Sequence, residues 1–158
     1  MLSFPFSYEK SKVIQALRYH FITRNEIRLM IILVNVFAIV SAALFFFQKV
    51  SPFAFLISSV LWFILMISFW FVLPYTVYKK AATFRDHFTV TFKEDFLMLE
   101  NERGSNSWKW EKFSKLIESP HFFHLYFNNR TFFLIPKITT GAVQVNDVRQ
   151  FLKLKIVN

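Results

Sequence analysis

Two long apolar runs decide the fold, LMIILVNVFAIVSAALFFF at Leu29–Phe47 and FAFLISSVLWFILMISFWFVL at Phe53–Leu73. Each run is long enough to cross the hydrocarbon core of a bilayer, which takes about 20 apolar residues in a helix. Only QKVSP at 48–52 separates them, so the spacing predicts a tight antiparallel hairpin. We therefore expect an integral membrane protein in which residues 29–78 form a transmembrane hairpin and the lipid bilayer is the first partner.

Positive charge is distributed unevenly around these runs. The formal net charge is +9, with Arg24 and Arg28 before the first run, basic residues again at 79–85, and only Lys49 in the loop. Basic residues near the ends of membrane helices stay in the cytoplasm. We predict a multi-pass protein of the inner (plasma) membrane, with both termini cytoplasmic and the short loop outside.

Residue types that support catalysis are scarce. The chain has no Cys, which excludes disulfides and thiolate chemistry. His121 and His124 bracket a predicted strand, where positions three apart face opposite ways and cannot share a metal. Gly104 and Gly141 are the only glycines, so a phosphate-cradling loop is excluded. We predict no enzyme activity, no metal and no cofactor. Acidic residues interspersed with the basic ones after residue 78 also argue against nucleic-acid binding.

Residues 1–28 are predicted to form a cytoplasmic segment with one basic amphipathic helix. The apolar residues of Lys10–Phe21 recur at helical spacing on one face, and basic residues lie elsewhere. A basic amphipathic helix next to a membrane span is typical of an interfacial helix on anionic lipid. A helix packed on a soluble domain fits the same pattern, and the sequence leaves both interpretations open.

From residue 84 onward the apolar pattern changes to an alternation of period two. It predicts about six short antiparallel strands, ended by turn residues, and then a helix that starts near Asn146. The predicted strands cover 87–92, 96–100, 105–112, 113–118, 122–127 and 131–135. Phe151, Leu152 and Ile156 would plug the open end of the curved sheet. The predicted fold is thus an α+β membrane protein, a two-helix hairpin followed at 84–158 by a small PH-like (pleckstrin-homology-like) antiparallel β domain closed by a C-terminal helix.

The chain resembles the YcxB-like family, small bacterial proteins with two membrane helices and a compact β domain. The resemblance rests on the hairpin together with three motifs. These are FTVTFKEDFLMLEN (88–101), the Trp110-centred SNSWKWEKFSKLIES (105–119), and FFHLYFNNRTFFLIPKITT (122–140) with its Ile135-Pro136-Lys137. The stretch 138–141 departs from the family, which often has an acidic helix start after Pro-Lys. The family's biochemical role is unassigned, so the resemblance implies a fold and a topology rather than a reaction.

Three lysines are the candidate contacts to a partner or a lipid headgroup. Lys137 follows Pro136 at a strand end, where its side chain can project from a fixed backbone. Lys109 and Lys112 alternate with aromatic residues in WKWEKF. The alternative interpretation of Lys137 is a surface lysine, solvated or paired with Glu111 or Glu118. Trp108 and Trp110 fit packing better than a ligand platform.

Three polar residues of the hairpin are the candidate interhelical contacts. Asn35 is the only amide in the first run, and it could bond to Ser58, Ser59 or a second copy of the chain. The alternative is that Asn35 bonds to a backbone carbonyl of its own helix. A homodimer through the hairpin remains open.

The sequence favours a binding function over an enzymatic one. The first hypothesis is a membrane-anchored PH-like binding module that engages a partner protein or the anionic membrane surface through a strand edge or face. The alternative is a small accessory or immunity-type protein whose hairpin packs on another membrane protein. A membrane-bound enzyme would need a catalytic constellation that the sequence does not contain.

Overall fold

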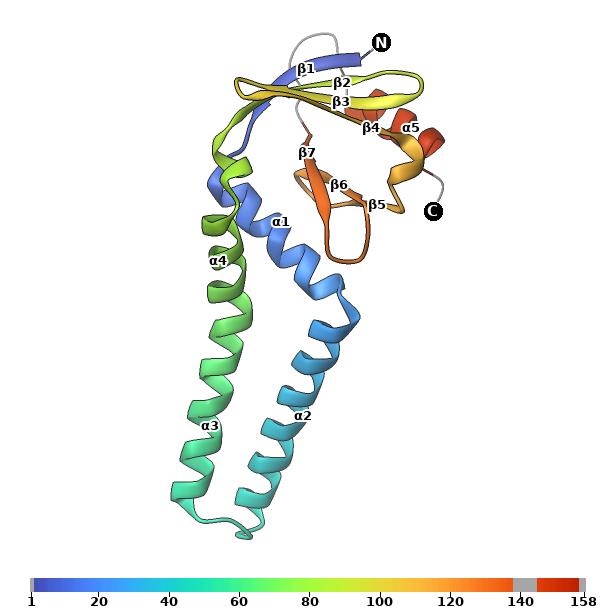
Figure 1. Ribbon diagram of the computed structural model, residues 1–158. Coiled ribbons are helices and arrows are strands. Elements are labelled where there is room, and N and C mark those ends of the chain that lie inside the picture. Colours follow the sequence, from blue (N-terminus) through green and yellow to red (C-terminus); the bar gives the residue numbers. More distant parts are fainter. Residues whose placement is uncertain (1, 138–144, 157–158) are drawn as a thin grey trace. The chain divides into compact units, whose positions relative to one another are not determined.

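The computed structural model describes residues 2–137 and 145–156, and its elements are α+β (Figure 1). Before and within the apolar region, the elements are β1 (Leu2–Ser7), α1 (Lys10–Thr23), α2 (Asn25–Phe46), α3 (Pro52–Ile67), the π-helical turn η1 (Ser68–Val72), α4 (Leu73–Lys80) and the 3-10 turn η2 (Ala82–Arg85). After it come β2 (His87–Phe92), β3 (Phe96–Asn101), β4 (Gly104–Lys109), the 3-10 turn η3 (Trp110–Lys112), β5 (Lys115–Glu118), β6 (Phe122–Tyr126), β7 (Phe132–Pro136) and α5 (Val145–Lys155).

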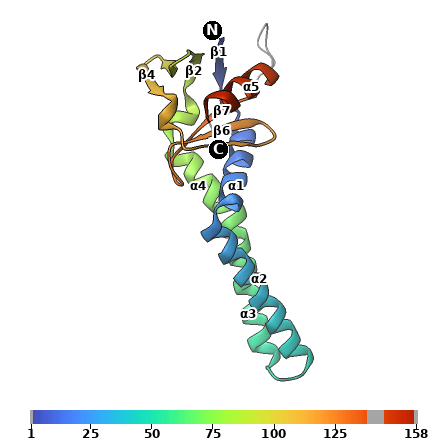
Figure 2. The same ribbon diagram turned by 90° about the vertical axis from the view of Figure 1, so that its right-hand side faces the viewer.

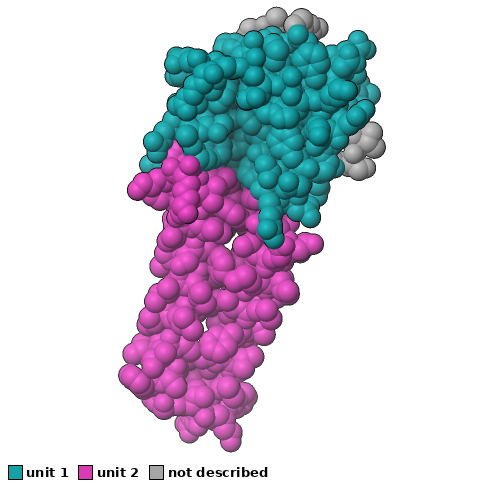
Figure 3. All heavy atoms as spheres, viewed as in Figure 1, with its two compact units in different colours: residues 1–16, 81–158 teal, residues 17–80 magenta. Residues whose placement is uncertain are grey.

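The chain divides into two compact units, which Figure 3 shows in different colours. Unit 1 contains residues 1–16 and 81–158, and unit 2 contains residues 17–80. The sequence-based division placed 1–28 in a segment of its own. The structure differs there, because the first 16 residues belong to the same unit as the β strands.

Unit 1 contains two antiparallel sheets, with strand orders β1-β2-β3-β4 and β5-β6-β7. The alternating pattern predicted all of these strands except β1. Strand β1 runs antiparallel to β2 from Leu2↔Phe92 to Ser7↔His87. The sequence analysis did not predict it, because it contains Pro5, a residue type confined within sheets to edge strands. Pro5 does lie at an edge, since β1 is the outermost strand of its sheet.

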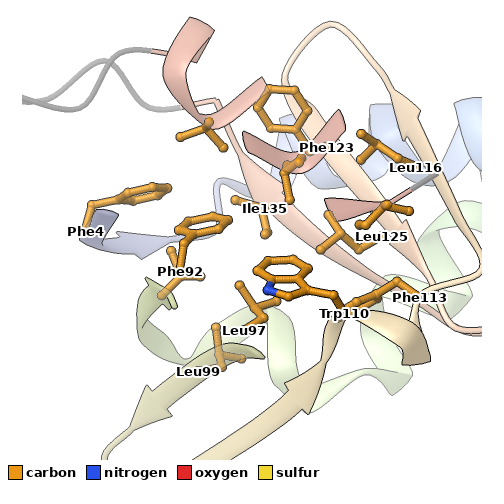
Figure 4. Packing of buried hydrophobic residues seen from close by; sticks show 14 of the residues in the cluster. Phe4, Phe92, Leu97, Leu99, Trp110, Phe113, Leu116, Phe123, Leu125 and Ile135 are labelled. Atoms are coloured by element: carbon orange, nitrogen blue, oxygen red, sulfur yellow. The ribbon is translucent and has the colours of Figure 1, made fainter. Parts of the chain in front are cut away.

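One aromatic core joins the two sheets and α5 (Figure 4). Phe4 of β1 stacks on Phe92 of β2, with 6.0 Å between ring centroids, and Leu152 of α5 is fully buried. Ile156 is also buried and Phe151 half-buried, so the helix closes the core with the three residues that the sequence singled out. Strand β1 is also tied to the second sheet, because the Tyr8 hydroxyl just after it donates to the Leu134 carbonyl at 2.7 Å. Burial raises the pKa of Tyr8 well above 10.0.

The apolar face of α1 is covered within the protein. Val13 and Ala16, on the part of α1 that belongs to unit 1, are both buried. They lie three residues apart, on one helix face. A helix whose apolar face is already covered does not need lipid to bury it. Of the two interpretations that the sequence left open, packing on protein is therefore the one this burial favours.

Unit 2 is dominated by two long apolar helices, and Figures 1 and 2 both show them as a hairpin. Helix α2 has 22 residues, and the continuous helix Pro52–Lys80 has 29. Both are long and apolar enough to cross a membrane. The loop between them turns at Gln48, whose φ is +56°, and the second helix starts with Ser51 accepting from the Ala54 amide and Pro52 in its first turn.

The second apolar helix runs past Pro74, a residue type that kinks or breaks helices. The π-helical turn Ser68–Val72 comes directly before this proline. Pro74 has no amide proton to donate to the Trp70 carbonyl four residues earlier. The Arg18 Nε donates to that carbonyl instead, at 3.0 Å, and the guanidinium lies 5.1 Å from the Phe71 ring centroid. A side chain from α1 therefore supplies the hydrogen bond that proline removes.

Candidate functional site

Lys137 lies in an ion cluster that joins three elements. Its Nζ is 2.6 Å from Oε1 of Glu118, at the end of β5. The same carboxylate accepts hydrogen bonds from Arg149 of α5, at 2.7 Å from Nη2 and 3.0 Å from Nε. Arg149 Nη1 also contacts Asn146 Oδ1. Of the two acids that the sequence offered as partners of Lys137, the structure pairs it with Glu118.

The geometry of this cluster points to a structural role for Lys137. Its ammonium also stands over the Phe123 ring, 5.3 Å from the centroid, and its side chain is only 15% exposed. The hydrogen bonds from Arg149 and Lys137 lower the pKa of Glu118 to about 2. One carboxylate thus ties α5 to the sheet β5-β6-β7, and Lys137 is not available as an exposed headgroup contact.

Glu118→Gln should lower the free energy of unfolding of unit 1 by about 1 kcal/mol at pH 7. This free energy is the contribution of a charge-assisted hydrogen bond, reduced because the carboxylate is partly exposed to solvent. Because the folded-state pKa is about 2 against the ordinary 4.5, the contribution is full above pH 4.5 and disappears as the pH falls towards 2. The difference from wild type should therefore shrink in urea titrations at pH 3.

Glu111→Gln is the matched control, because Glu111 is exposed and was the other acid available by sequence. It should change the unfolding free energy by less than about 0.5 kcal/mol at either pH. Equal effects of the two substitutions, or an effect of Glu118→Gln that does not depend on pH, would contradict the role given to the cluster.

Lys109 and Lys112 are placed differently from Lys137. Lys109 ends the edge strand β4 and Lys112 lies in η3, and both are exposed. Trp110, between them, points inward instead: its indole stacks on Phe92, and Nε1 donates to the Lys93 carbonyl at 3.1 Å. The exposed surface at β4 and η3 therefore contains Lys109 and Lys112. Lys137 does not belong to it.

The hairpin residues also differ from one another in their contacts. Asn35 donates to the Ile31 carbonyl of its own helix at 2.8 Å, the alternative raised from the sequence, and its Nδ2 also contacts Met66 Sδ of α3 at 4.0 Å. Ser59 bonds to the Phe55 carbonyl in its own helix. Ser58 does reach across, but to Ser41, at 2.6 Å between the hydroxyl oxygens. Ser41 is a partner that the sequence analysis missed.

The sequence carries only weak signals for the contact residues that the sequence analysis did not name, which are Arg149, Ser41 and Arg18. Arg149 and Glu118 lie far apart in sequence, and only the docking of α5 beside β5 brings them together. Ser41 and Ser58 lie at similar distances from the loop at 48–52, so folding the hairpin about that loop would have paired them. Arg18 had no sequence signal beyond the missing amide of Pro74. Within residues 2–137 and 145–156, no three metal-ligating side chains gather in one place.

Comparison with known proteins supports the family resemblance. Residues 92–152 match the family model described as YcxB-like protein, a stretch from the end of β2 into α5. Over this stretch the chain is similar to YcxB-like proteins, which supports the resemblance seen in the sequence. No curated protein and no solved structure matches the chain. The family's function is uncharacterised, so the function is argued from the geometry.

Proposed function

We propose that this chain is a membrane-anchored binding module without enzymatic activity, a PH-like domain held at the cytoplasmic face of the plasma membrane that engages a partner protein. The observation that carries the proposal is the insertion of both apolar helices between two neighbouring strands. Ser7, the last residue of β1, pairs with His87, the first of β2. The residues before and after the helical region, 8–86, are therefore direct neighbours in one sheet. If both helices cross the bilayer, the flanks of the hairpin lie on one side.

The architecture of unit 1 supports the PH-like part of the proposal. A four-stranded and a three-stranded antiparallel sheet share one core, and a C-terminal helix closes it. A β domain of this kind leaves its strand edges outside, where a partner segment can pair with them.

Strand β4 is the edge that best suits binding. Natural edge strands are usually protected by proline, by charge or by being short. Among the described edges, β1 contains Pro5, β7 ends at Pro136, and β5 has only four residues. Strand β4 has six residues, almost all exposed, and its only charge is Lys109 at the end. A partner segment could add a strand here, with Lys109 and Lys112 contacting its acidic groups.

The absence of Cys from the sequence allows a direct test of the anchoring. Single-cysteine variants Lys49→Cys, in the loop, and Lys115→Cys, in β5, place reporters at two exposed positions. A membrane-impermeant maleimide added to intact protoplasts should label position 49 and leave position 115 unlabelled until the cells are lysed. Labelling of position 115 in intact protoplasts, or recovery of the chain in the alkaline-washed soluble fraction, would contradict the proposal.

The second candidate function is the accessory or immunity-type role, and one observation favours it. Neither α2 nor α3 contains a buried residue, so the hairpin leaves most of its apolar surface uncovered. Besides lipid, a helix of another membrane protein could cover that surface. The Ser41–Ser58 hydrogen bond would hold the hairpin together for such packing. Loss of partner binding in Ser58→Val, with binding retained after charge reversal at Lys109 and Lys112, would favour this role over the first.

A further inference from the structure

A groove on unit 1 lies between the turn that joins β2 to β3 and the helix α5. Its volume is about 490 Å³, and it is lined by Phe92, Lys93, Glu94, Phe151, Leu154 and Lys155. Phe92 and Phe151 meet edge to face, with 5.9 Å between centroids. The floor of the groove is therefore aromatic, and its two walls come from segments distant in sequence.

The rim of this groove is basic. Lys155 stands over the Phe151 ring at 5.8 Å, and Lys93 stands over the Phe96 ring at 4.9 Å. Glu94 is the acidic residue of the lining. The two lysines of the lining against one carboxylate leave a local excess of positive charge around an apolar floor.

Leu154, at the border of the groove, is unusually exposed for an apolar residue of unit 1. It is 78% exposed, and it is the only large hydrophobic side chain exposed on the described part of unit 1. A single exposed leucine is unremarkable by itself. Here it borders a concave apolar surface and lies between two lysines, Lys153 and Lys155. An apolar centre surrounded by a polar rim is the usual arrangement of a protein interface.

We propose that this groove binds an acidic segment of a partner protein, anchored by one large apolar side chain on the aromatic floor beside Leu154. The inference deepens the proposed function by giving the chemistry of the partner. Charge complementarity with the lysines selects acidic groups. Glu94 favours a protein segment over an anionic bilayer, because a segment of mixed charge can place a donor against Glu94 whereas a surface of uniform negative charge repels it.

The test uses the full chain in nanodiscs of phosphatidylcholine, which carry no net charge. The probe is a fluorescein-labelled peptide of aspartates and glutamates around a central Leu-Phe pair, followed by fluorescence anisotropy. We expect saturable binding that is lost when the Leu-Phe pair is replaced by Ser-Ser. The double variant Lys93→Glu/Lys155→Glu should weaken binding by more than about tenfold, and Leu154→Ser by about tenfold, the value of one buried leucine side chain.

The matched control is Lys115→Glu/Arg130→Glu, which makes the same charge change at exposed positions outside the groove. It should alter binding by less than about twofold. Equal weakening by both double variants, or no saturable binding at millimolar peptide, would overturn the proposal. The proposal would also be overturned if vesicles of phosphatidylglycerol bound through Lys93 and Lys155 and the peptide did not bind. None of these peptide-binding outcomes changes the result of the cysteine labelling at positions 49 and 115. Failure of this proposal is therefore distinguishable from failure of the proposed membrane anchoring.

Discussion

Replacing Phe4 and Phe6 together by serine is expected to unfold unit 1, although the rest of its strands lie beyond residue 86. Both side chains are buried, Phe4 against Phe92 and Phe6 against Phe88 at 5.8 Å. Removing one buried phenylalanine typically costs about 3–5 kcal/mol. Two such losses match the whole stability of a typical domain, about 5–15 kcal/mol. The first seven residues thus carry much of the stability of the C-terminal strands.

Limited trypsin digestion of the full chain in detergent measures this effect. The many Lys and Arg residues of 81–158 should become rapidly cleaved in the double variant, while the wild type resists cleavage there. Pro5→Ala is the control, because Pro5 lies between the two phenylalanines but faces outward and is exposed. It should behave like wild type. Equal resistance of the double variant and the wild type would mean that β1 is dispensable.

The elements that the sequence predicted best are those with a strong local signal. The apolar runs predicted both long helices, and the structure extends them to Asn25–Phe46 and Pro52–Lys80, because helical hydrogen bonding continues into the polar flanks. The alternation after residue 84 predicted β2 to β7 within a few residues. The segment 105–112 was predicted as one strand but breaks at Trp110 into a 3-10 turn, which lets the indole enter the core.

The features that depend on distant partners could not be predicted in this way. Strand β1 pairs with a strand that follows the whole hairpin, and no local pattern encodes that pairing. The same holds for the candidate sites. Sequence position marked Lys137 as unusual, but only the fold shows that Glu118 and Arg149 meet it. The groove beside Leu154 is likewise made by a turn and a helix that are remote in sequence. The stretch 138–144, which holds the departure from the family, lies outside the described residues.

A cross-link between β1 and β2 should form almost completely in the intact protein. Ser3 and Thr91 are direct partners in the two strands, and their hydroxyl oxygens are 2.9 Å apart. Cysteines at these positions would be close enough for a disulfide. The chain has no other Cys, so Ser3→Cys/Thr91→Cys gives one defined pair. The mismatched pair Ser3→Cys/Glu100→Cys, which are not partners in any ladder, is the control.

The most direct measurement is this cross-link in native membranes, with a protease site inserted in the loop 48–52. After mild oxidation and cleavage at that site, the account predicts that the two halves of the Ser3→Cys/Thr91→Cys protein stay together on a non-reducing gel and separate on reduction. The halves of the mismatched pair should separate under both conditions. Separation of the Ser3→Cys/Thr91→Cys halves without reductant would contradict the account, because the hairpin would then not be inserted between two paired strands of one domain.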